Sequence, residues 1–110
     1  MLEATLTADA STDAVEFVFT VTNGGTEPAA LSFRSGKTAD IVVSKGEETV
    51  WRWGEGRAFT MAIREFSLEP GEQISESFTW NDPPSGSYTA TGMLEIEGGP
   101  TAETAFNVSE

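Results

Sequence analysis

The sequence predicts an all-β, antiparallel immunoglobulin-like β-sandwich of about seven to nine strands. Apolar residues alternate with polar ones at a period of two rather than about 3.6, and no segment has sustained helical periodicity. Turn-forming clusters rich in Gly, Pro, Asn and Asp recur at short intervals. The chain has no cysteine and hence no disulfide, and its 110 residues, 38% hydrophobic, suffice for one core. We therefore expect a single immunoglobulin-like domain over residues 1–110.

Four segments alternate most clearly, at residues 14–22, 31–34, 74–80 and 88–96. In each, one parity is mainly apolar, as in strands with one packed face. Glu76 is a conflict, because it falls on the apolar side of its segment. The side chains expected inside are Val15, Phe17, Phe19 and Val21; Leu31 and Phe33; Ile74, Phe78 and Trp80; and Tyr88, Ala90, Gly92, Leu94 and Ile96.

Eight turn clusters imply about nine strands in all. Successive turns of an antiparallel sandwich fall at alternate ends if every strand crosses its full height. One end would then carry Arg34, Lys37 and Arg57, which makes it the expected binding end. The two sets of turns are residues 9–13, 35–37, 54–56 and 81–86 at this end, and residues 23–28, 45–47, 69–71 and 97–100 at the other.

The surface is strongly acidic, with 18 acidic against six basic residues and a net charge of −12. Such a surface repels nucleic acid and anionic lipid, so we expect neither as a partner. The amino terminus lacks the basic and apolar regions of an export signal, and no apolar run is long enough to span a membrane. We expect a cytoplasmic monomer. A halophilic origin and simple solubility are both open explanations of the charge.

The chain also lacks histidine. Without histidine and cysteine it has neither the usual general base nor the commonest metal ligands. We therefore expect a protein that is not an enzyme and that has no cofactor and no metal site.

The most distinctive segment is W-R-W-G-E-G-R-A-F-T-M at residues 51–61. It holds two of the three tryptophans, and residues 50–64 carry a charge of +2 against −14 for the rest of the chain. Trp51 and Trp53 lie two residues apart and share one face, which favours a place in the core. Residues 54–59 are expected to form a loop.

Several blocks together resemble the intracellular proteinase inhibitor family of BsuPI type. The blocks are F-T-V-T-N at 19–23, L-S-F-R-S-G-K-T-A-D-I at 31–41, V-W-R-W-G-E-G-R-A-F-T at 50–60, L-E-P-G-E at 68–72, and Trp80 followed by P-S-G-S-Y at 84–88. The resemblance spans residues 17–96. It implies an immunoglobulin-like sandwich that binds and blocks subtilisin-type serine proteases inside the cell.

Such an inhibitor presents a rigid, extended segment that pairs with the substrate cleft and fills the S1 pocket. S1 pockets of subtilisin-type enzymes favour large apolar side chains, so Phe59 and Met61 are the candidate anchors. Phe59 could equally seal the sandwich beneath the loop. The predicted protease-binding residues are Arg34, Ser35, Lys37, Gly54, Glu55, Gly56, Arg57, Ala58, Phe59, Met61, Pro83 and Pro84.

Two other functions are compatible with the residues. One is a non-catalytic immunoglobulin-like module for protein interaction or structure. The other is carbohydrate binding, which requires Trp51 or Trp53 to face solvent. The consecutive prolines Pro83 and Pro84 are typical of a rigid corner, which could support a neighbouring loop.

Overall fold

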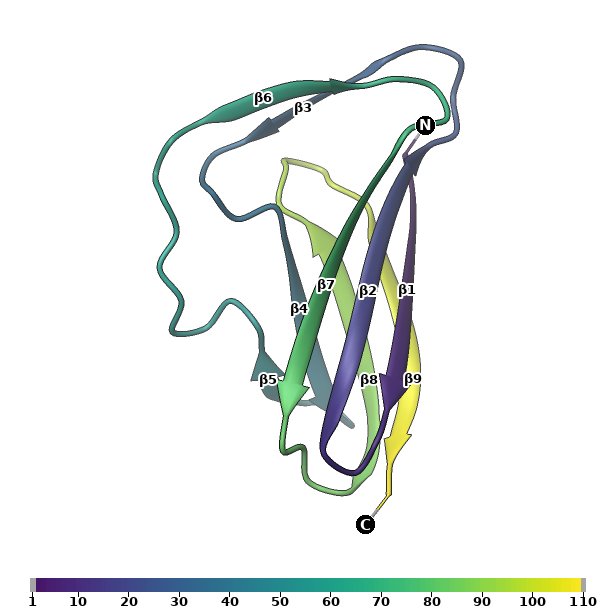
Figure 1. Cartoon of the computed structure of the whole chain (residues 1–110), viewed down its shortest axis with the longest axis vertical. Helices are drawn as coiled ribbons and strands as arrows, with labels where there is room; N and C mark the ends of the chain where they lie inside the picture. Colours follow the sequence, from purple (N-terminus) through teal and green to yellow (C-terminus); the bar gives the residue numbers. More distant parts are fainter. Residues whose placement is uncertain (1, 110) are drawn as a thin grey trace.

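The computed structural model describes residues 2–109, apart from the side chain of Phe66, and confirms an all-β immunoglobulin-like sandwich (Figure 1). All the strand pairs in its sheets are antiparallel. The described residues contain no helix that is long and apolar enough to cross a membrane. The strands are β1 (Leu2–Ala10), β2 (Ala14–Asn23), β3 (Ala29–Phe33), β4 (Ala39–Lys45), β5 (Glu48–Arg52), β6 (Arg64–Leu68), β7 (Gln73–Asn81), β8 (Gly86–Leu94) and β9 (Thr101–Val108).

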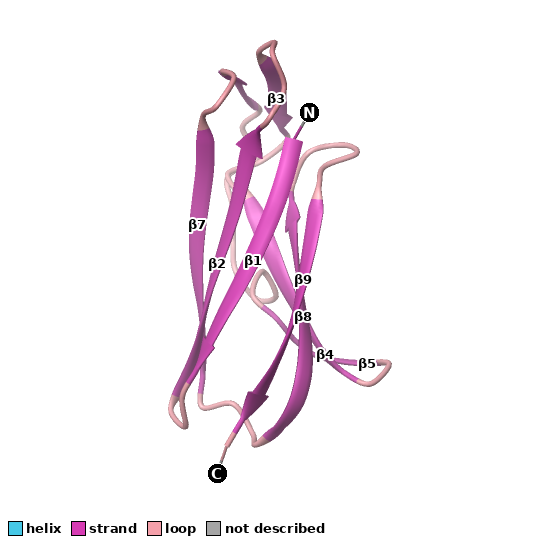
Figure 2. Ribbon diagram, turned by 90° about the vertical axis from the view of Figure 1, so that its right-hand side faces the viewer, coloured by secondary structure: helices cyan, strands magenta, loops and turns pink. Residues whose placement is uncertain are grey.

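Two sheets form the layers of the sandwich, in the orders β1-β2-β7 and β5-β4-β8-β9. Figure 2 shows the layers facing each other, with β1 beside β9 along one side. Strands β3 and β6 pair with each other, as a separate two-stranded ribbon. The segment from β5 to β6 runs along the outside of the sandwich, on the side away from β1 and β9 (Figure 1).

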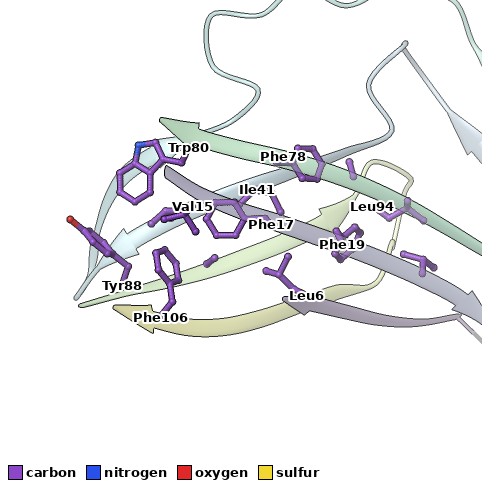
Figure 3. Packing of buried hydrophobic residues seen from close by; sticks show 14 of the residues in the cluster. Leu6, Val15, Phe17, Phe19, Ile41, Phe78, Trp80, Tyr88, Leu94 and Phe106 are labelled. Carbon is purple, nitrogen blue, oxygen red and sulfur yellow. The ribbon is translucent and has the colours of Figure 1, made fainter. Parts of the chain in front are cut away.

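The core lies between the layers and follows the predicted alternation. Val15, Phe17, Phe19 and Val21 in β2 are all at most 1% exposed, and side chains from both sheets meet them (Figure 3). Aromatic rings line the part of this core near the β7–β8 connection. Their stacked and edge contacts include Phe17 with Trp51 at 6.0 Å, Trp51 with Trp80 at 5.6 Å and Trp80 with Tyr88 at 5.2 Å between ring centroids.

The predicted sorting of turns by alternating ends is wrong, because β3 does not cross the sandwich. Its five residues span only about 17 Å and pair with β6. The chain then enters the β5-β4-β8-β9 sheet as β4. The connection from β3 to β4 therefore lies beside the turn after β8, where the Glu95 amide donates to the Thr38 carbonyl at 2.9 Å. The turn at Gly46 lies instead at the end that holds the β7–β8 connection (Figure 1).

Candidate functional site

The segment from residue 53 to residue 63 connects β5 to β6 and begins with two successive tight turns. The Glu55 amide donates to the Arg52 carbonyl at 3.2 Å, and the Arg57 amide donates to the Gly54 carbonyl at 3.3 Å. Gly56 has a φ of 78°, in the left-handed region that glycine occupies without steric cost. The segment therefore starts as a compact, hydrogen-bonded loop.

Arg57 and Trp53 hold this loop together from within. The Arg57 guanidinium lies 4.4 Å from the centroid of the Trp53 ring, and its Nε donates to the Trp53 carbonyl at 2.7 Å. The Trp53 ring meets Phe78 of β7 edge-on at 4.8 Å. Trp51 and Trp53 are both half-buried and pack against the core, as the sequence predicted.

Phe59 is half-buried beneath the loop. Its ring lies 5.8 Å from that of Trp53, and the Lys37 ammonium stands 5.7 Å from its centroid. The residue lines a cavity of about 100 Å³ together with Glu76 and Phe78. This placement also explains Glu76, which faces the inner side of β7 but borders the cavity and stays half-buried.

Residues 61–63 are the most exposed apolar part of the segment. Met61 is 86% and Ile63 69% exposed. Within the described chain, the backbone groups of residues 61–63 make no hydrogen bond. Both flanks are fixed: the Gly36 amide donates to the Thr60 carbonyl at 2.8 Å, and β6 begins at Arg64.

Arg64 fixes the far flank through three contacts. Its Nε donates to the Ser35 carbonyl at 3.0 Å and an Nη donates to the Thr38 hydroxyl at 3.0 Å. The guanidinium lies 4.8 Å from the centroid of the Phe33 ring. The β3–β4 connection and residues 53–63 therefore support each other along their length.

Asp40 is a residue of this site that the sequence reasoning missed. Its carboxylate is fully buried and lies 2.6 Å from the Lys37 ammonium and 3.7 Å from the Arg52 guanidinium. Lys37 also pairs with Glu95 at 3.1 Å. The block L-S-F-R-S-G-K-T-A-D-I at residues 31–41 contains Asp40. A carboxylate on the polar face of a strand is usually solvated, however, so its burial could not be foreseen.

These ion pairs neutralise much of the positive charge that the sequence places around the site. Lys37 and Arg52 are neutralised by Asp40 and Glu95, and Arg34 lies 4.0 Å from Glu97 in a highly exposed pair. Burial lowers the pKa of Lys37, but its hydrogen bonds to Asp40 and Glu95 raise it by more, so the net shift is upward. Two of the three residues expected to form a basic surface, Arg34 and Lys37, are therefore paired with carboxylates.

The prolines lie elsewhere. Pro83 is buried and Pro84 exposed in the β7–β8 connection at the lower end of Figure 1, away from residues 53–63. The Tyr88 hydroxyl donates to the Pro84 carbonyl at 2.6 Å, which ties this corner to β8. The predicted grouping of Pro83 and Pro84 with the loop is therefore wrong, whereas Ser35, Lys37, Gly54, Arg57 and Phe59 do come together.

Within residues 2–109, no group of three or more His, Cys, Asp and Glu side chains is arranged to hold a metal ion. The arrangement of the loop is instead that of a contact surface. It combines a packed base of Trp53 and Phe59 with exposed apolar side chains at Met61 and Ile63.

Solved structures of low sequence identity share this fold. The CARDB domain of PF1109 from Pyrococcus furiosus, solved in complex with di-metal ions, has a TM-score of 0.55 at 16% identity, over 98% of this chain and 92% of that one. Spo0M, a sporulation control protein from Bacillus subtilis, has a TM-score of 0.53 at 18% identity, over 99% of this chain and 49% of that one. A β-glucosidase from Kluyveromyces marxianus contains a similar part, with a TM-score of 0.57 at 14% identity, over 100% of this chain and 14% of that one.

A search of curated protein sequences finds no significant match. The family profile described as "intracellular proteinase inhibitor" (BsuPI) matches residues 2–98 of the chain. That match covers strands β1 to β8 and the whole of the candidate site. The chain therefore belongs to the intracellular proteinase inhibitor family, BsuPI.

Proposed function

We propose that this protein is a non-catalytic inhibitor of subtilisin-type serine proteases in the cytoplasm. Its segment of residues 58–63 enters the active-site cleft in the manner of a substrate. The observation that carries this proposal concerns residues 61–63: they are exposed, their backbone groups make no hydrogen bond to any other described residue, and both flanks are fixed.

Met61 is the anchor in this proposal. A protease cleft binds an extended peptide through main-chain hydrogen bonds, and pockets take alternate side chains. Met61 offers a long, apolar and 86% exposed side chain to the S1 pocket, and Ile63 lies on the same parity. Phe59, the other candidate anchor, already packs against Trp53, so it supports the segment from below.

Rigidity is what would distinguish the segment from a substrate. A segment that is already ordered loses little conformational entropy on binding. After cleavage, held flanks keep the new ends close together, which favours resealing of the peptide bond. The hydrogen bond from the Gly36 amide to the Thr60 carbonyl and the contacts of Arg64 provide such flanks.

The net charge of the chain indicates its oligomeric state and its partners. A net charge of −12 opposes self-association and opposes binding to nucleic acid and anionic membranes, so the working form is a monomer with a protease as its partner. The same charge is suited to a cell with high internal salt.

The test is an active-site titration of a subtilisin-type protease from the same cell, in high salt. The wild-type chain should inhibit at a near-stoichiometric ratio, with slow clipping confined to residues 54–63. Met61→Ala should weaken inhibition by about 30-fold, or about 2 kcal/mol, the loss typical of a buried interface anchor.

Val50→Ala is the matched control, because Val50 is an exposed apolar residue of β5 outside the loop. It should leave inhibition unchanged. The proposal fails if the wild-type chain does not inhibit, or if the Met61 and Val50 variants inhibit equally well.

A further inference from the structure

Asp40 combines a charged side chain with complete burial on a face of β4 that should be solvated. Its neighbours Ala39 and Ile41 point into the core, so alternation directs Asp40 to the opposite face of the sheet. The side chain is nevertheless 0% exposed. Other parts of the chain must therefore cover it, and their identity indicates what Asp40 does.

The two carboxylate oxygens of Asp40 contact different groups. Oδ1 accepts hydrogen bonds from two backbone amides, from Ile41 at 2.8 Å and from Gly54 at 2.9 Å. Oδ2 faces two cations, the Lys37 ammonium at 2.6 Å and the Arg52 guanidinium at 3.7 Å. One side chain of β4 thus holds both the beginning of the 53–63 segment and the β3–β4 connection.

Gly54 is adapted to this contact. A Cβ at Gly54 would lie 2.8 Å from Oδ2 of Asp40 and 2.7 Å from the Lys37 ammonium, closer than real Cβ atoms come to other atoms. Gly54 does not have a positive φ, so its backbone conformation does not require glycine. The close approach to Asp40 and Lys37 favours glycine instead, because an added Cβ would have to displace the ends of both side chains.

The contacts continue from Asp40 to the exposed segment. Lys37 stands over the ring of Phe59. Next to Lys37, the Gly36 amide binds the Thr60 carbonyl, one residue before Met61. An ordered path of direct contacts therefore joins the buried carboxylate to the base of the proposed anchor.

A contribution to stability alone does not account for such a residue. Burying a charge costs free energy that its partners only offset, and buried ion pairs can often be replaced by apolar side chains without loss of stability. Their better-attested use is to select one geometry among several. We infer that Asp40 is a positioning residue, which holds residues 53–60 in the conformation that presents Met61. That inhibition needs this conformation of Met61 rests on the proposed function; the positioning of residues 53–60 by Asp40 does not.

The test measures the loop directly, without the target protease. Three variants are compared with the wild-type chain: Asp40→Leu, Asp40→Asn and Gly54→Ala. Native-state cleavage by thermolysin, a metalloprotease unrelated to the proposed target, reports opening of residues 54–63, with the sites identified by mass spectrometry. Hydrogen exchange of the Gly54 amide reports the contact itself, and exchange of the Phe17 amide in the central strand β2 reports global opening.

Asp40→Leu should accelerate loop cleavage and Gly54 exchange at least tenfold relative to Phe17 exchange. Asp40→Asn keeps an oxygen acceptor for Gly54 but loses the charge that faces Lys37, so an increase of only about threefold is expected. Gly54→Ala should resemble Asp40→Leu. The double variant should add little to either single change, because both break the same contact. Asp13→Asn, at an exposed turn, is the control and should match the wild-type chain.

The inference is overturned if Asp40→Leu changes loop cleavage and Gly54 exchange no more than Phe17 exchange. If Asp40→Leu does not fold, Asp40→Asn decides by the same criterion. A wild-type chain that inhibits no subtilisin-type protease would refute the proposed function but leave these measurements intact. If it does inhibit, Asp40→Leu should be clipped by that protease at least tenfold faster, and an unchanged rate would refute the positioning role alone.

Discussion

At the scale of single residues, Phe59 and Met61 have different environments although they lie two positions apart. Phe59 packs on Trp53 and Lys37, whereas Met61 is 86% exposed. Both are large and apolar, so their chemistry alone did not distinguish them. The difference arises at Thr60, where the bond from Gly36 fixes the chain just before it leaves the packed base.

Exposure of Met61 leads to a prediction about oxidation. Peroxide transfers one oxygen to the thioether, giving the sulfoxide and water, and exposed methionines react first. Met61 should oxidise faster than the half-buried Met93, and its polar sulfoxide should weaken protease inhibition by about tenfold. Peptide mass spectrometry and titration after removal of peroxide measure the two effects. Met61→Leu should inhibit equally before and after treatment, and an equal loss in this variant would contradict the prediction.

Lys37 leads to a prediction about alkaline stability. Its pKa in the folded state is raised above the ordinary value of 10.5, so its contribution to stability is complete below that pH and is lost as the pH rises through the raised pKa. The difference in unfolding free energy between the wild-type chain and Lys37→Met should therefore shrink above pH 10.5. Urea unfolding at successive pH values measures it. Lys37→Arg, whose cation does not titrate in this range, should keep its advantage over Lys37→Met, and a wild-type difference that stays constant would contradict the prediction.

At the scale of elements, the length of a strand decides which loops meet. Strand β2 has 10 residues and β7 has nine, whereas β3 and β6 have five each and form their own ribbon. The ribbon brings the β3–β4 connection alongside residues 53–63. A full-length β3 would have carried that connection to the opposite end of the sandwich.

Strand β8 also depends on a close approach, at Gly92. A Cβ there would lie 2.6 Å from Cδ1 of Phe19, whose ring is buried. Gly92→Ala should therefore destabilise the fold by about 1–3 kcal/mol, as overpacking of a core does. Urea unfolding measures this loss. Phe19→Leu should make room, so the double variant should lose less than the sum of the single changes; a neutral Gly92→Ala would contradict the predicted contact.

At the scale of the whole molecule, charge is unevenly distributed. The ion pairs around Asp40 are internally balanced, so the net charge of −12 resides mainly on the remaining surface. Carboxylates at high density repel one another, and salt screens that repulsion.

We therefore predict that the melting temperature rises by about 5 °C between low salt and about 1 M KCl, the equivalent of about 1 kcal/mol. Scanning calorimetry measures it. The control carries Glu47→Lys, Glu48→Lys and Glu103→Lys, three exposed positions, which change the net charge from −12 to −6. Its salt dependence should be clearly smaller, and an equal dependence in both chains would contradict the role of self-repulsion.

Much of the fold could be predicted from the sequence. The inward residues of β2 follow from alternation, because the two faces of a strand differ at every step along the chain. The half-buried places of Trp51 and Trp53 follow in the same way. Of the site, the sequence indicated the segment around residues 51–61 and its neighbour at residues 35–37, which do meet.

The sequence by itself therefore determined the all-β class, the inward faces of the strands and the family, since these depend on local alternation and on the order of short blocks. Only the tertiary structure decided that β3 pairs with β6, that Asp40 is buried under Gly54 and Lys37, and that Pro83 and Pro84 lie at another end. These outcomes depend on contacts between distant parts of the chain. A carboxylate on the polar side of a strand has the same local pattern in solvent and under a loop, and only the partners that fold over it distinguish the two.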